Sequence, residues 1–263
     1  MNLVSERYSI TPYEPKLGIH DYILKKISKF ILYIIGWKSF EQTEQVKRIL
    51  SNERYVLTFS HTSSWDAVFF LLYKFAHPET FSRFRIIVKP QVYDSVPKWT
   101  HSILNKIGFM KATAYENKNG GFVNTVVDTL KDKENFSLLI SPKGKRENSP
   151  WRSGYFAIAK ELNCDIMVCG LDYEKKRMIF FDPVSIKNKS REEIEPILMK
   201  QLSEIVPLYT ECSEVSLRKH KKENITLFTI SFIIICLLIF MTYLSWYYKL
   251  LFILVILIFF ILL

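Results

Sequence analysis

The middle of this chain alternates between strand and helix patterns, and this alternation limits its fold more than any other feature. Three short apolar runs have the β-branched and aromatic content typical of buried strands, at 55–59, 84–88 and 138–140. Patterns typical of helices separate them, at 67–73, 97–107 and 121–131. The alternation favours an α/β domain with a central, mostly parallel sheet flanked by helices.

The segment Ser60-His-Thr-Ser-Ser-Trp-Asp66 lies where the first strand ends and a helix begins. Asp66 falls in the first helical turn, so its carboxylate can accept a hydrogen bond from one ring nitrogen of His61 while the other faces a cleft. Such a pair suits a general base near neutral pH. The alternative is a purely structural histidine at a helix start. A residue of the Thr62–Ser64 stretch is expected to cap the helix.

A second block begins with the strand at 138–140, continues through Ser-Pro-Lys-Gly-Lys-Arg to residue 146, and leads into a helix pattern at 154–159. Three cations in this loop, Lys143, Lys145 and Arg146, suit a phosphate or another anionic head group. Gly144 lets the backbone come close to that group. The alternative is a solvated basic loop.

In order and spacing, these two blocks resemble the signature of the glycerolipid acyltransferases. The likeness runs from about Gly36 to Pro183 and includes a late strand at 164–173. It implies a glycerol-phosphate acyltransferase-like fold, with His61 as base and Asp66 orienting it. It also implies acyl-CoA as donor and a lysophospholipid as acceptor, with 1-acylglycerol-3-phosphate as the default.

The sequence departs from the family pattern at two places. Lys143 stands where the family has an acidic residue, and Lys145 where it has threonine. In the middle block, 107–116, no arginine follows the hydrophobic run, so Lys111 or Lys118 is the available substitute. Because lysine offers a point charge rather than a bidentate fork, these changes leave the acceptor's identity open.

The C-terminus holds two strongly apolar runs, 225–244 and 250–263. At about 1.5 Å per residue, the first is long enough for a hydrocarbon core of about 30 Å, and we expect a transmembrane helical hairpin at 223–263. These runs predict an integral membrane protein. The basic cluster 218–222 just before the first run favours an orientation in which the catalytic domain, 39–222, faces the cytosol.

At the other end, segment 22–35 alternates lysines with apolar residues at helical spacing. We expect residues 1–38 to form an arm and an amphipathic helix on the membrane surface. An ordinary helix packed on the domain fits the pattern equally well.

The net charge of +10 is consistent with an anionic lipid surface and with the phosphates of CoA. Nucleic acid is not expected as a partner, because no zinc-finger spacing, glycine-rich RNA motif or basic heptad appears. The cysteines show no metal-ligand spacing, so we expect no metal, and no cofactor besides acyl-CoA as co-substrate.

These features predict a membrane-bound acyltransferase of phospholipid biosynthesis or remodelling, with membrane lipids, acyl-CoA and a lysophospholipid as its partners. Two alternatives stay open: a catalytically silent lipid-binding membrane protein, and a transacylase that moves acyl chains between phospholipids without CoA.

Overall fold

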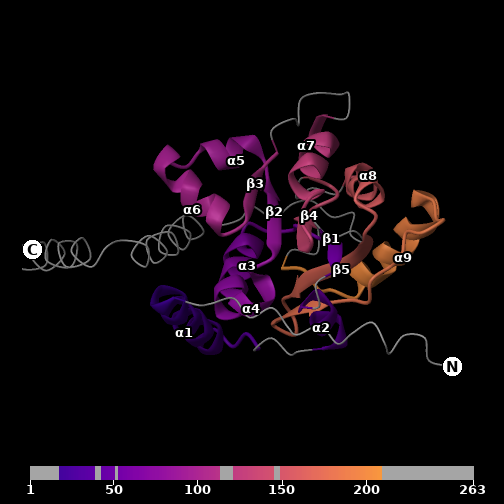
Figure 1. Ribbon diagram of the computed structural model, residues 1–263. Helices are drawn as coiled ribbons and strands as arrows, with labels where there is room; N and C mark the ends of the chain where they lie inside the picture. Colours follow the sequence, from indigo (N-terminus) through magenta and orange to yellow (C-terminus); the bar gives the residue numbers. More distant parts are fainter. Residues whose placement is uncertain (1–17, 39–42, 51–52, 113–120, 145–148, 209–263) are drawn as a thin grey trace, which may run out of the picture.

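The computed structural model describes residues 18–38, 43–50, 53–112, 121–144 and 149–208 of the chain (Figure 1). The strands within these ranges are β1 Arg54–Phe59, β2 Phe84–Val88, β3 Phe109–Lys111, β4 Phe136–Ile140, β5 Asp165–Asp172 and β6 Arg177–Phe180. The helices are α1 Ile19–Ile34, α2 Glu44–Leu50, α3 Trp65–Ala76, α4 Pro78–Phe81, α5 Pro90–Asp94, η1 Lys98–Thr100, α6 His101–Lys106, α7 Gly121–Leu130, α8 Gly154–Glu161 and α9 Arg191–Ser203.

The described strands form one sheet in the order β3-β2-β4-β1-β5-β6. β1 lies between β4 and β5 and is parallel to both, with Leu57 opposite Leu139 on one side and Met167 on the other. β2 and β3 extend the parallel part. Only β6 runs antiparallel, as the second arm of a hairpin with β5. The loops that leave β1, β4 and β5 therefore emerge at one edge of the sheet, where α/β proteins place their ligands.

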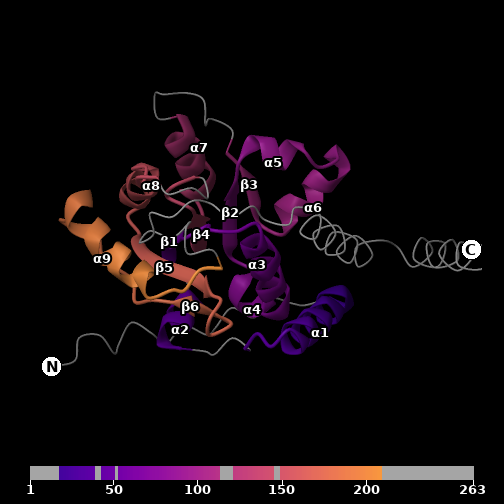
Figure 2. The ribbon, with the colours of Figure 1, turned by 180° about the vertical axis from the view of Figure 1, so that it is seen from behind.

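Helices cover both faces of the sheet (Figures 1 and 2). Side chains along β1 alternate between the two layers, since Tyr55, Leu57 and Phe59 join one core and Val56 the other. The first core includes residues of α1, α2 and α3, and the second includes residues of α7, α8 and α9. Burial on both faces explains why the central strands are almost continuously apolar.

The strands predicted at 55–59, 84–88 and 138–140 are confirmed as β1, β2 and β4. The helix predicted at 97–107 is instead a short 3₁₀ turn, η1, followed by α6. The short strands β3 and β6 and the short helices α4 and α5 were not predicted. Each is too short to show a periodic pattern of its own.

The predicted fold class joined the α/β domain to a C-terminal transmembrane hairpin at 223–263, and this prediction is corrected. No helix in the described part of the chain is long and apolar enough to cross a membrane. The longest described helix, α1, has 16 residues and contains lysines at 25, 26 and 29. At about 1.5 Å per residue it measures about 24 Å, less than a hydrocarbon core of about 30 Å. Residues 209–263, with the basic cluster 218–222, lie outside the described residues.

A buried lysine on α3 makes the stability of the domain depend on pH. Lys74 is 6% exposed, and its ammonium donates to the carbonyl oxygen of Phe81 at 2.5 Å. Burial, together with the nearby Arg85 guanidinium as the smaller cause, lowers the pKa of Lys74 from 10.5 to about 7. Between these two pH values the unfolded chain binds a proton that the folded chain does not. The free energy of unfolding therefore rises with pH across this window. Below about pH 7 both states bind the proton, so the free-energy cost of burying the charged ammonium no longer changes with pH.

We expect Lys74→Met to remove this pH dependence. The stability of the variant relative to wild type should fall by up to about 1.4 kcal/mol per pH unit as the pH rises from about 7 toward 10.5. Urea unfolding at a series of pH values measures this difference. Lys160→Met, at an exposed position of α8, is the control. A difference that stays constant with pH would show that Lys74 is equally protonated in both states.

Candidate active site

The central strand β1 ends at Phe59, and the turn at 60–64 leads from it into α3. Because β1 is flanked by two parallel neighbours, this turn lies at the middle of the sheet's carboxyl edge. The first predicted motif is therefore placed where several loops converge.

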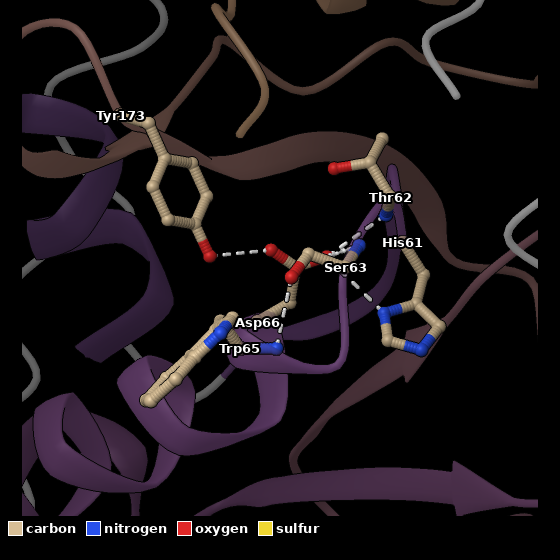
Figure 3. A network of polar contacts seen from close by, with 6 residues as sticks. All are labelled: His61, Thr62, Ser63, Trp65, Asp66 and Tyr173. Atoms are coloured by element: carbon tan, nitrogen blue, oxygen red, sulfur yellow. Dashed lines mark hydrogen bonds and ion pairs between the residues drawn. The ribbon is translucent and has the colours of Figure 1, made fainter. Parts of the chain in front are cut away.

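The turn is built around the carboxylate of Asp66, the second residue of α3. Asp66 is 2% exposed, and its Oδ2 accepts hydrogen bonds from the backbone N–H of Thr62 at 2.8 Å and of Ser63 at 2.9 Å (Figure 3). The hydroxyl of Ser63 accepts from the N–H of Trp65 at 3.0 Å. Ser64 occupies the N-cap position but makes no capping bond through its side chain. The first helical N–H groups are thus satisfied by Ser63 and the turn, while Asp66 ties the turn back to the helix.

His61 completes this arrangement. Its Nδ1 lies 3.2 Å from Asp66 Oδ2, and 36% of its side chain is exposed. An ionised carboxylate only accepts hydrogen bonds, so the pairing assigns the proton to Nδ1 and leaves a lone pair on Nε2. Figure 3 shows the second ring nitrogen directed away from Asp66. The two residues predicted from the sequence are thus in contact, with Nε2 directed away from the carboxylate.

Tyr173, which the sequence analysis did not single out, supplies a further donor to the pair. Its hydroxyl donates to Asp66 Oδ1 at 2.7 Å, from the residue that follows β5 (Figure 3). Both carboxylate oxygens are therefore engaged, Oδ2 by the turn and His61, and Oδ1 by Tyr173. The sequence could have indicated Tyr173 through its position directly after the buried strand β5, which ends at the same edge of the sheet as β1.

Two aromatic rings hold the Tyr173 ring in place. The ring of Trp37 lies 5.2 Å from it and that of Phe69 5.6 Å, both edge to face, and Trp37 stacks on Phe69 at 4.0 Å. Phe69 belongs to α3, and Trp37 follows α1. The N-terminal helix and the polar network are thus connected through one aromatic cluster.

The second predicted motif lies in the loop between β4 and α8, which leaves the same edge of the sheet as the His61 turn. Gly144 has φ +65°, a left-handed conformation that favours glycine, and its N–H donates to the Ser141 carbonyl at 3.0 Å. Lys143 is only 3% exposed, so this lysine is part of the packed loop. Lys145 and Arg146 lie outside the described residues.

The lysine proposed to replace the arginine of the middle motif is engaged elsewhere. Lys111 ends β3, and its ammonium pairs with the Asp94 carboxylate at 2.6 Å. β3 is the edge strand, separated from β1 by β2 and β4. Lys118, the other substitute, is outside the described residues.

Across the described ranges, no group of three or more His, Cys, Asp or Glu side chains could hold a metal ion. Neither models of known protein families nor characterised proteins give a match to this chain.

We expect Tyr173→Phe to lower the free energy of unfolding by about 1.5–3 kcal/mol, because Asp66 Oδ1 loses the donor that lies 2.7 Å away while its carboxylate stays buried. Urea unfolding of wild type and variant measures the difference.

Tyr93→Phe is the matched control, because it removes a hydrogen bond of equal length, from the Tyr93 hydroxyl to Asn105 Oδ1 at 2.7 Å, away from Asp66. Because this bond joins two neutral groups, its loss should cost only about 0.5–1.5 kcal/mol. An equal loss of stability in the two variants would contradict a charge-assisted hydrogen bond from Tyr173 to Asp66.

Proposed function

We propose that this protein is an acyltransferase that moves a fatty acyl group from acyl-CoA to a hydroxyl of a lysophospholipid. The observation that carries the proposal is the His61–Asp66 pair at the carboxyl edge of the central strand. A partly exposed histidine with a buried carboxylate behind it is the arrangement that general-base chemistry requires. The resemblance of the two sequence blocks to glycerolipid acyltransferases supports the choice of reaction.

In this proposal, Nε2 of His61 accepts the proton of the acceptor hydroxyl as its oxygen attacks the thioester carbonyl. A C–O bond forms, the C–S bond then breaks, and the imidazolium returns the proton to the departing thiolate. Asp66 keeps the ring oriented and stabilises its positive charge during the transfer. The step is balanced by the two substrates alone and needs no covalent acyl-enzyme.

The acceptor proposed first is 1-acylglycerol-3-phosphate. The loop after β4 leaves the sheet beside the His61 turn, and its left-handed Gly144 keeps the backbone free of a side chain there. We place the phosphate at this loop, held by Lys145 and Arg146. Lys143 is buried within the loop, so we assign it the role of holding the loop in the conformation that binds the head group. Its burial does not suit the capture of ligand from solvent.

The test is transfer of labelled acyl groups by membranes that contain the full chain, with a panel of lysophospholipids as acceptors. His61→Ala should lower the rate by about 10²-fold or more, and Asp66→Asn, which keeps the shape of the side chain, should also lower it strongly. Glu79→Gln is the matched control, because Glu79 also faces a histidine, His77, at 3.8 Å, but on α4. It should leave the rate unchanged.

Two arms of the same assay test the alternatives. Transfer that proceeds from labelled phospholipid without acyl-CoA would replace the proposal by a CoA-independent transacylase. Wild-type membranes that match empty membranes on every donor and acceptor, while the protein still binds lysolipid, would replace it by a silent lipid-binding protein.

A further inference from the structure

The N-terminal helix α1 exposes an unusual number of large apolar side chains. Tyr33 is 80% exposed, and Phe30 and Ile34 are each 63% exposed. Ile19, Tyr22 and Ile23 are exposed on the same helix. Several such side chains gathered on one 16-residue helix mark an interaction surface rather than scattered surface residues.

These residues follow the helical repeat, on the side of α1 turned away from the domain. Leu24, Ser28 and Leu32, spaced by four, are buried where α1 packs on α3. Ile23, Phe30 and Ile34 recur at spacings of seven and four and form a second stripe, separate from the packed one. Figure 1 shows α1 at the margin of the fold, beside α3 and α4. The helix thus has one face for the domain and another for a partner.

Exposed lysines border the apolar stripe. Lys26 and Lys29 are exposed, and the Lys26 ammonium lies 5.3 Å from the centre of the Tyr22 ring. Lys25, nearer the domain, pairs with Glu79 at 3.0 Å. The acidic residue of the helix, Asp21, accepts from the N–H of Gly18 at the helix start. The exposed charge beside the stripe is therefore positive.

We propose that this face of α1 lies on an anionic lipid surface, with the apolar stripe among the acyl chains and the lysines at the phosphates. Charge complementarity selects this occupant. A second copy of the chain, paired through α1, would bring lysines against lysines. The apolar runs 225–244 and 250–263 contain no Asp or Glu that could pair with them. Lipid phosphates supply both the negative charge and, beneath it, an apolar phase.

This contact would bring the site close to its substrates. Trp37, three residues after the end of α1, packs against the Tyr173 ring, whose hydroxyl binds Asp66. A lipid surface under α1 therefore lies at one end of a short chain of contacts that ends at His61. This last consequence rests on the proposed function, whereas the lipid contact itself does not.

The experiment places a nitroxide label at one position at a time in the full chain, with Cys212 and Cys236 replaced by serine; Cys164 and Cys169 are buried. The labelled variants are Phe30→Cys and Ile34→Cys, and the control is Lys200→Cys, exposed on α9. The protein is reconstituted in phosphatidylcholine vesicles with phosphatidylglycerol. Collisions of the label with oxygen, which concentrates in lipid, and with a water-soluble nickel chelate are measured by power-saturation EPR. No acyl donor is present.

We expect the ratio of oxygen to nickel collisions to be several-fold higher at 30 and 34 than at 200. Replacing both Lys26 and Lys29 by glutamate should lower this ratio at 30 and 34, and Lys131→Glu should not. Equal ratios at 30, 34 and 200 would overturn the proposal. Two further results would also overturn it: labels shielded from both reagents, which indicate protein cover, and spin–spin broadening, which indicates a second copy. Because no transfer is measured, a failure here is distinct from a failure of the acyltransferase proposal.

Discussion

The candidate site depends on one buried charge. Asp66 is 2% exposed, and a carboxylate in that position is stable only when its oxygens are well supplied with donors. The donors come from three parts of the structure: the backbone of the turn after β1, the ring of His61, and the hydroxyl of Tyr173 after β5. Satisfying this single carboxylate therefore fixes the path of the turn, the orientation of the histidine and the end of a neighbouring strand.

The sheet makes this convergence possible. β1 lies between two parallel neighbours, so the loops after β1, β4 and β5 meet at one edge although they are far apart in sequence. The β5–β6 hairpin also reaches the N-terminal segment, where the Lys38 N–H donates to the carbonyl oxygen of Lys176 at 2.8 Å. Together with the ring contacts of Trp37, this links the exposed helix α1 to the polar network. The proposed chemistry and the proposed lipid contact thus involve one continuous part of the domain.

The features that the sequence predicted well are local ones. The apolar runs of the central strands and the five-residue separation of His61 and Asp66 reflect contacts between neighbours in the chain. Tyr173 was missed because it reaches Asp66 across 107 residues, and only the strand order brings the two together. Lys143 was expected as one of three accessible cations, but packing of its loop buries it. Lys111 was one of two lysines considered as a substitute for the family's arginine, and it pairs with Asp94, whose position depends on the unpredicted helix α5. Charge and spacing identified these lysines as candidates without showing what each one contacts.

The central claim is that Asp66 holds His61 with its proton on Nδ1 and a free lone pair on Nε2. The most direct measurement is a long-range ¹H–¹⁵N correlation spectrum of ¹⁵N-histidine protein, with the His61 signals assigned from the His61→Ala variant and recorded above the pH at which the ring is protonated. The account predicts the Nδ1–H tautomer for wild type and a redistribution toward Nε2–H in Asp66→Ala. A wild-type ring that carries its proton on Nε2 would contradict the account, because the nitrogen assigned to base chemistry would then be a donor.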